Sequence, residues 1–273
     1  MSSRSLADEL VALALSAGRE IMAIYDGDQG AETKADGSPV TAADTAAEAV
    51  ILAGLRRVAP GVPVVAEEEV AAGRVPEIGR RFFLVDPLDG TKEFIRRNGE
   101  FTVNIALVED GAPVMGVVYA PALGNLCVGT VGEGARTARV AADGSCAWSD
   151  IRVRAVPAAG LDVVASRSHL TAETKAFIDR FVVRDMVSAG SSLKFCRVAT
   201  GAADLYPRLA RTMEWDTAAG DAVLRAAGGR VTTVDGELLR YGKRNQATDT
   251  DFANPWFVAA GGFDPFAETA RPS

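Results

Sequence analysis

A four-residue apolar run, Phe82 to Val85, is followed at once by the hexapeptide Asp-Pro-Leu-Asp-Gly-Thr at residues 86–91. The run has the length and residue types of a buried strand. Pro87 cannot donate to a strand ladder and Gly90 favours a turn, so both predict that the strand ends here. The turn lets Asp86 and Asp89 converge on one point. We therefore expect a pair of carboxylates at the end of a buried strand.

Two carboxylates at close range repel each other, and a divalent cation between them removes that cost. The chain has one His, and its three Cys form no Cys-x-x-Cys pair, so a metal is expected on oxygen ligands. Such ligands favour Mg²⁺ or Mn²⁺. Gly90 and Thr91 precede a segment that can begin a helix, and free N–H groups at a helix start bind phosphate. The alternative is an Asp-Pro turn and a capped helix without chemistry.

Five further acidic residues, at three places in the chain, have a functional and a structural interpretation. The triplet at residues 67–69 follows a short predicted strand and is either a solvated edge or a source of one or two more ligands. Asp216 is either a helix N-cap or a carboxylate that completes a metal site between two half-domains. Asp44 is either the acidic member of a capping box or a partner of Thr91 that orients a metal-bound water.

The length of 273 residues suits one large domain or two small ones. Residues 1–150 predict helices plus a largely antiparallel sheet, since apolar positions at helical spacing precede apolar, β-branched runs. Residues 151–273 alternate strands and helices, which predicts an α/β layer. The join is expected near residues 135–160. The sequence thus indicates an α+β N-terminal part and an α/β C-terminal part.

The charge balance and the N-terminus exclude some classes of protein. There are 36 acidic and 29 basic residues, a net charge of −7, which argues against nucleic-acid binding. No signal-like apolar region is recognised, and the run Leu10 to Ala17 is far shorter than the roughly 20 residues that a membrane span needs. We expect no integral membrane segment and a cytoplasmic location, with peripheral association at the inner membrane left open.

Several motifs together resemble the inositol monophosphatase superfamily of Mg²⁺-dependent, lithium-sensitive phosphatases. The motifs of the superfamily stand at residues 66–68, 86–91 and 215–220. Segments at residues 89–95, 98–107, 116–121, 190–196 and 205–208 are similar to its bacterial 3′(2′),5′-bisphosphate nucleotidase branch. The resemblance spans about residues 34–261. It implies a layered α-β-α-β-α sandwich of the sugar-phosphatase type.

The resemblance also implies roles for individual residues. Two or three Mg²⁺ ions, or Mn²⁺, are expected on Glu67, Asp86, the backbone carbonyl of Leu88, Asp89 and Asp216. The catalytic residues are expected to be Glu67 together with Asp44 and Thr91, which position the nucleophilic water. Substrate binding is expected at Leu88, Asp89, Gly90, Thr91, Ser166, His169, Gly190, Lys194 and Asp216. Whether Glu67, Glu68 or Glu69 is the ligand stays open, and His169 is alternatively a surface residue at a helix start.

The function that the resemblance implies is hydrolysis of the 3′-phosphate of adenosine 3′,5′-bisphosphate to AMP and phosphate, with 3′-phosphoadenylyl sulfate as a second substrate. The partner is then a small nucleotide, and the protein a monomer or homodimer. Candidates for the second phosphate are Arg167, Lys194, Arg208 and Arg211. The close alternative is an inositol-1-monophosphatase or another sugar-phosphate phosphatase. A more distant one is a non-enzymatic regulatory protein that keeps the fold.

Overall fold

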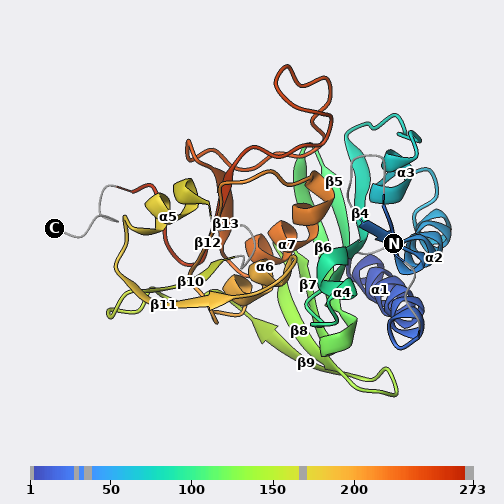
Figure 1. The fold of residues 1–273 in the computed structure, drawn as a ribbon, viewed down its shortest axis with the longest axis horizontal. Helices are drawn as coiled ribbons and strands as arrows, with labels where there is room; N and C mark the ends of the chain where they lie inside the picture. The colour runs from blue at the N-terminus through green and yellow to red at the C-terminus, as the bar shows by residue number, and fades with distance from the viewer. Residues whose placement is uncertain (1–2, 28–30, 34–38, 166–170, 268–273) are drawn as a thin grey trace.

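The computed structural model describes residues 3–27, 31–33, 39–165 and 171–267. Two large sheets and three helical layers alternate in the order α-β-α-β-α (Figure 1). This confirms the layered sandwich that the sequence predicts. None of the helices in the described ranges combines the length and apolar character that a membrane crossing requires.

The first sheet has seven strands in the order β3-β4-β5-β6-β7-β8-β9. Their bounds are β3 Val64–Ala66, β4 Arg81–Asp89, β5 Thr102–Glu109, β6 Ala112–Ala120, β7 Asn125–Thr130, β8 Gly134–Val140 and β9 Cys146–Ile151. β3 runs parallel to β4, and the other neighbours are antiparallel. The β5–β6 hairpin turns at Asp110 and Gly111, which both have positive φ, as a tight two-residue turn requires.

Two long helices, α1 (Ser3–Tyr25) and α2 (Ala42–Val58), cover one face of this sheet. Their apolar stripes, predicted from three- and four-residue spacing, pack on the inward side chains of β4 to β7. The ring of Tyr25 lies 5.1 Å from that of Phe94 and 5.0 Å from that of Phe101. This core fixes the helix starts and strand ends near which the acidic residues lie.

The second sheet has five strands in the order β11-β10-β12-β14-β13. Their bounds are β10 Leu161–Ala165, β11 Val183–Ser188, β12 Leu205–Arg208, β13 Arg230–Thr233 and β14 Phe257–Ala260. Helices α6 (Leu193–Ala199) and α7 (Glu214–Ala226) lie between the sheets, and α5 (Ala172–Ile178) packs on β12. α7 approaches the first sheet closely because Gly116 faces it: a Cβ there would lie 2.3 Å from the carbonyl oxygen of Ala219.

Short elements complete the described chain: β1 Ala31–Thr33, β2 Pro39–Thr41, α3 Glu67–Ala71, α4 Thr91–Ile95 and the 3₁₀ turn η1 Pro121–Leu123. The sequence prediction differs from the structure in two places. The strand expected to end before Pro87 continues to Asp89. The strands β8 and β9 were not placed by the sequence; the first sheet ends at Ile151 and the second begins at Leu161, within the range 135–160 where the join is expected.

Candidate metal and substrate site

The carboxyl end of β4 carries the two acids of the hexapeptide. The pairing of β4 with β5 shifts between Asp86 and Asp89, so Pro87 lies where the ladder is already interrupted and needs no N–H. The N–H of Leu88 donates to Asp86 Oδ1 at 3.0 Å and closes the local turn. Gly90 follows with φ of 94°, a left-handed conformation that favours glycine, and α4 begins after it. The strand prediction is wrong in its end point, because a bulge accommodates the proline.

The parallel pairing of β3 with β4 brings the Glu triplet to the same edge. Ala66 pairs with Val85, so Glu67 and Asp86 follow paired residues on neighbouring strands. Glu67 lines the cavity described below, and its charge raises the pKa of Asp86 and of Asp216. Glu69 instead forms a bidentate ion pair with Arg74 at 2.8 Å. Of the two, Glu67 is the one directed to the site.

A buried acid that the sequence analysis missed supports the triplet. Glu48, on α2, is only 4% exposed, and its Oε2 accepts the N–H of Glu68 at 2.9 Å. Burial and the charges of the triplet raise the pKa of Glu48 to about 7, against that hydrogen bond. Glu48 lies one helical turn after Asp44, and this four-residue spacing on one helix face is the signal that could have found it.

The two carboxylate oxygens of Asp44 have different partners. Its Oδ2 accepts the N–H and the hydroxyl of Thr41, each at 2.7 Å, which makes the capping box of α2. Its Oδ1 accepts the hydroxyl of Thr91 at 3.2 Å. The same hydroxyl lies 3.4 Å from the carbonyl oxygen of Leu88. The cap holds the carboxylate in place and leaves its second oxygen in contact with Thr91.

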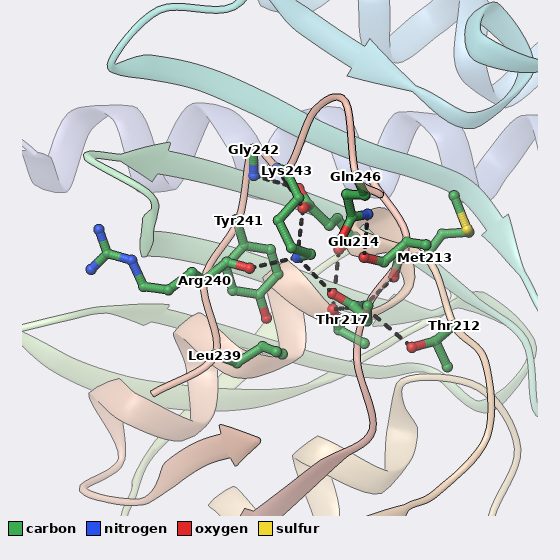
Figure 2. Close-up of polar contacts among 12 residues, drawn as sticks. Thr212, Met213, Glu214, Thr217, Leu239, Arg240, Tyr241, Gly242, Lys243 and Gln246 are labelled. Atoms are coloured by element: carbon green, nitrogen blue, oxygen red, sulfur yellow. Dashed lines mark hydrogen bonds and ion pairs between the residues drawn. The ribbon is translucent and has the colours of Figure 1, made fainter. Parts of the chain in front are cut away.

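Asp216 enters from the second half of the chain, in the first turn of α7. Its Oδ2 accepts the N–H of Met213 at 2.8 Å, so the capping interpretation also applies. The start of α7 is fixed by Glu214, which is fully buried and accepts the N–H groups of Gly242 and Lys243 at 2.6 and 2.9 Å. Figure 2 shows Glu214 and Lys243 facing each other, with Nζ 2.6 Å from the carboxylate. This network, absent from the sequence analysis, positions Asp216.

The electrostatics place these acids in one neighbourhood. Burial raises the pKa of Asp86 well above its ordinary value, and the charges of Glu67, Asp89, Asp216 and Asp44 raise it further. Burial likewise raises the pKa of Asp216, with the charges of Asp89 and Glu67 adding to the effect. The cluster therefore carries more negative charge than its protein surroundings neutralise.

A segment from the second half, the loop that ends in the first turn of α6 at residues 189–194, lies over Asp89. The N–H of Ser192 donates to Asp89 Oδ2 at 2.7 Å, and the hydroxyl of Ser191 lies 2.8 Å from the Asp89 carbonyl oxygen. Gly190 donates its N–H to Glu100 Oε2 at 3.0 Å, and a Cβ there would lie 2.6 Å from the Glu100 carbonyl oxygen. Burial raises the pKa of Asp89, opposed first by the charge of Lys194.

Lys194 is 5% exposed, and its Nζ donates to the carbonyl oxygens of Ser191 at 2.6 Å and Ala189 at 3.3 Å. Burial lowers its pKa to about 8, although the charge of Asp89 opposes this. Lys194 therefore stabilises the loop through its two hydrogen bonds and also offsets part of the negative charge of the site.

One cavity of about 690 Å³ joins these groups. The predicted site residues that line it are Glu67, Asp89, Gly90, Thr91, Gly190, Lys194 and Asp216. Asp44, Asp86 and Leu88 are buried and do not line the cavity. Ser166 and His169 lie outside the described residues. The volume is in the range of pockets that bury a small organic ligand.

The donor set fits a hard divalent cation. One carboxylate oxygen of Asp86 and one of Asp216 each accept a hydrogen bond from a backbone N–H. No other described residue hydrogen-bonds to their second oxygens. Within the described ranges, no three acidic, Cys or His side chains already form a ready-made metal group. The buried surplus of carboxylates nevertheless suits oxygen coordination, because a cation would offset the repulsion that raises their pKa values.

The chain also matches known proteins. The model of the inositol monophosphatase family matches residues 3–261. The chain belongs to the inositol monophosphatase family. It is 47% identical over 259 residues to the 3′(2′),5′-bisphosphate nucleotidase CysQ of Escherichia coli, covering 92% of this chain and 97% of that protein.

Two solved structures of the inositol monophosphatase family extend the comparison. CysQ from Bacteroides thetaiotaomicron has a TM-score of 0.78 at 40% identity, covering 96% of this chain and 99% of that one. Inositol monophosphatase from Anabaena has a TM-score of 0.74 at 26% identity, covering 96% and 93%. The family fold thus accommodates proteins named for two different substrate classes, and the substrate must be argued from this chain's own cavity.

Proposed function

We propose that this chain is a divalent-cation-dependent phosphomonoesterase that removes the 3′-phosphate of adenosine 3′,5′-bisphosphate, giving AMP and phosphate. The observation that carries the proposal is that one cavity joins the acidic cluster to a basic side. The basic side chains that line it are Lys92, Arg96, Lys194, Arg208 and Arg211. A substrate with two separate anionic groups is complementary to such a cavity. The similarity to nucleotidases named CysQ supports the same substrate class.

The residues proposed to hold two or three Mg²⁺ ions, or Mn²⁺, are Glu67, Asp86, the carbonyl of Leu88, Asp89 and Asp216. When bound, such ions supply Lewis acidity to the phosphoryl oxygens and lower the pKa of coordinated water. Gly90 lets the Ser191 hydroxyl approach this edge closely, because a Cβ at that position would lie 2.1 Å from the Ser191 hydroxyl oxygen. We propose that the scissile phosphate lies against Gly90 and Thr91.

Asp44 and Thr91 are proposed to position the attacking water. Because Thr91 donates its hydroxyl hydrogen to Asp44 Oδ1, the lone pairs of Thr91 Oγ1 are available to accept a hydrogen from that water. The water oxygen forms the new P–O bond as the bond from phosphorus to the 3′ oxygen breaks. A proton released from the water balances the one taken up by the 3′ oxygen. The protein's own contribution is to orient the water and to keep its charged side chains in fixed positions.

The substrate side of the proposal concerns the loop at residues 189–194 and the nucleoside. Gly190 and Lys194 border the same cavity as the acids, and we propose that they contact the nucleotide. Ser166 and His169 remain proposed nucleoside contacts. Adenosine 3′-phosphate 5′-phosphosulfate offers the same 3′-phosphate and is proposed as a second substrate. The second candidate function, inositol-1-monophosphatase, is favoured by the family and by the fold similarity to the Anabaena enzyme.

Phosphate release from adenosine 3′,5′-bisphosphate and from inositol 1-phosphate, each with Mg²⁺ and with a chelator, separates these functions. We expect Mg²⁺-dependent release with a preference for the bisphosphate. Asp89→Asn should abolish release, while Asp143→Asn, the same change in the exposed turn before β9, should not. A preference for the inositol ester would overturn the nucleotidase proposal. Release that is indifferent to chelation, or to Asp89→Asn, would overturn the metal-dependent mechanism.

A further inference from the structure

Two polar residues, Thr102 and Asn104, lie at the start of the otherwise mostly apolar strand β5. Asn104 pairs with Asp86 and Thr102 pairs with Asp89 across the β4–β5 ladder. Because opposed residues of antiparallel strands share a face, both side chains lie on the face that carries the acids. Thr102 and Asn104 are fully buried. A buried amide costs free energy unless its donors and its acceptor find partners, so its surroundings indicate its role.

The oxygen of the Asn104 amide has a partner, but its nitrogen does not. Ser192 donates its hydroxyl hydrogen to Asn104 Oδ1 at 2.6 Å. Asn104 Nδ2 is buried and has no hydrogen-bond partner among the described residues. The bond from Ser192 fixes the orientation of the amide, because an amide accepts through its oxygen and donates through its nitrogen. The donor end of Asn104 is therefore held in one direction without an acceptor, which is an unfavourable state for a buried N–H group.

The carboxylate of Asp89 lies beside this unpaired donor. Ser192 connects the two residues, since its N–H donates to Asp89 Oδ2 at 2.7 Å while its hydroxyl holds Asn104. Burial raises the pKa of Asp89, and the Asn104 side chain is one of the groups that lower it, acting as a hydrogen-bond donor. The Asn104 amide is thus within reach of the Asp89 carboxylate without the geometry of a completed hydrogen bond. Asp89 itself borders the cavity.

We propose that Asn104 is a positioning residue whose Nδ2 donates to the Asp89 carboxylate when Asp89 serves as a cation ligand, and that it thereby raises the affinity for the cation. The inference rests on the proposed function, which makes Asp89 a ligand. A hydrogen bond that forms only when the cation is bound contributes to the binding free energy. The donor also favours the ionised carboxylate, which is the form that ligates a metal. Residues that hold a ligand without contacting the metal change metal affinity by about 10- to 100-fold.

The alternative role for Asn104 is to anchor Ser192 alone. That role needs only the Oδ1 acceptor and gives no reason for a buried donor beside Asp89. Thr102 provides the comparison, because its Oγ1 lies 2.7 Å from Ser192 Oγ in the same buried chain. Among the described residues, no hydrogen bond joins the Thr102 side chain to Asp89. Thr102→Val therefore disturbs the anchor of Ser192 and leaves the donor beside Asp89 in place.

Titration calorimetry with Mg²⁺ alone, without substrate, measures the cation affinity directly. For Asn104→Leu, which keeps a similar side-chain volume and removes the amide, we expect the affinity for Mg²⁺ to fall by about 10- to 100-fold. Thr102→Val is the matched control and should bind Mg²⁺ as tightly as wild type. Asn104→Ser provides a second variant if Asn104→Leu fails to fold. Its hydroxyl can still accept from Ser192, but the shorter side chain lacks the amide donor, so Mg²⁺ binding should again weaken.

Phosphate release from adenosine 3′,5′-bisphosphate supplies the second readout. Raising the Mg²⁺ concentration should restore most of the kcat of Asn104→Leu, because the variant weakens cation binding and not the step that follows it. Unchanged Mg²⁺ affinity in both Asn104 variants, an equal loss in Thr102→Val, or a fall in kcat that Mg²⁺ does not restore would overturn the positioning role.

The wild-type protein separates this inference from the proposed function. Wild type that binds Mg²⁺ without hydrolysing the bisphosphate would overturn the proposed function, while the calorimetric comparison of the variants still decides the role of Asn104. Wild type that binds no Mg²⁺ would overturn both.

Discussion

A buried chain of hydroxyls ties the loop at residues 189–194 to β5, and Ser192→Ala should break it. Ser192 donates its hydroxyl hydrogen to Asn104 Oδ1 at 2.6 Å. Thr102 Oγ1 lies 2.7 Å from Ser192 Oγ, and because the only Ser192 hydroxyl hydrogen is already used, Thr102 must be the donor there. Thr102 and Asn104 are fully buried, and Ser192 is 2% exposed. The variant leaves one donor and one acceptor without partners.

The cost follows from those two orphaned groups. Each is expected to cost about 1–2 kcal/mol, so Ser192→Ala should lower the free energy of unfolding by about 2–4 kcal/mol. Thr102→Val removes one hydrogen bond and leaves Ser192 bonded to Asn104, so it should cost about 1 kcal/mol. In the double variant the Thr102 hydroxyl is no longer orphaned, and the combined cost should be less than the sum by about 1 kcal/mol.

Urea denaturation of the four proteins, monitored by fluorescence and by circular dichroism, measures this cycle. Strictly additive costs would contradict the coupling between Thr102 and Ser192. A Ser192→Ala protein within about 0.5 kcal/mol of wild type, the range of surface changes, would show that the network does not stabilise the loop.

Three further predictions concern the site and the pH dependence of stability. Glu48→Ala, which removes the acceptor of the second N–H of α3, should raise the Mg²⁺ concentration needed for half-maximal activity, whereas Glu48→Gln keeps an acceptor and should raise it less. A Mg²⁺ titration of phosphate release that cannot tell the two variants apart would refute this role. Gly190→Ala should impair activity because its Cβ would lie 2.6 Å from the Glu100 carbonyl oxygen, whereas Gly79→Ala, with open space around it, should not, and equal kcat/KM values would contradict the close approach. The pKa of Asp221 is raised to about 6, chiefly by burial, so its protonation favours the folded state below its ordinary pKa of 3.8 and this contribution is lost as pH rises through about 6. Relative to Asp221→Asn, wild type should therefore lose up to about 3 kcal/mol of stability between pH 4 and pH 7, and a pH-independent difference in denaturation midpoints would contradict the shift.

Local patterns in the sequence predicted the main helices and strands because the spacing of apolar residues within each of them is visible in the sequence. α2 begins after Thr41 with the capping box that Thr41 and Asp44 predict. The end of β4 was misjudged because a proline was taken to stop a strand, whereas the bulge between Asp86 and Asp89 accommodates it. β9, the edge strand, and β8 beside it were missed because these partly exposed strands carry little hydrophobic signal.

Some residues of the site could likewise be predicted from local sequence, and others could not. Asp86 and Asp89 were readable because both stand in one six-residue motif. Glu67 could be separated from Glu69 only when the structure showed Arg74 beside the latter. The partners of Ser192 come from β5, about 90 residues away, and no local pattern reports them. The buried Nε of Arg208 has no hydrogen-bond partner, and this is likewise a tertiary property, since it depends on which acceptors the fold leaves out of reach.

The most direct test of the account follows the phosphorus atoms of adenosine 3′,5′-bisphosphate by ³¹P NMR during one reaction. With Mg²⁺ present, the 3′-phosphate resonance should disappear as inorganic phosphate grows, the 5′-phosphate resonance should persist as that of AMP, and a chelator should stop the change. Loss of the 5′-phosphate first, turnover that continues under chelation, or no turnover at all would contradict the claim that this chain is a metal-dependent 3′-nucleotidase.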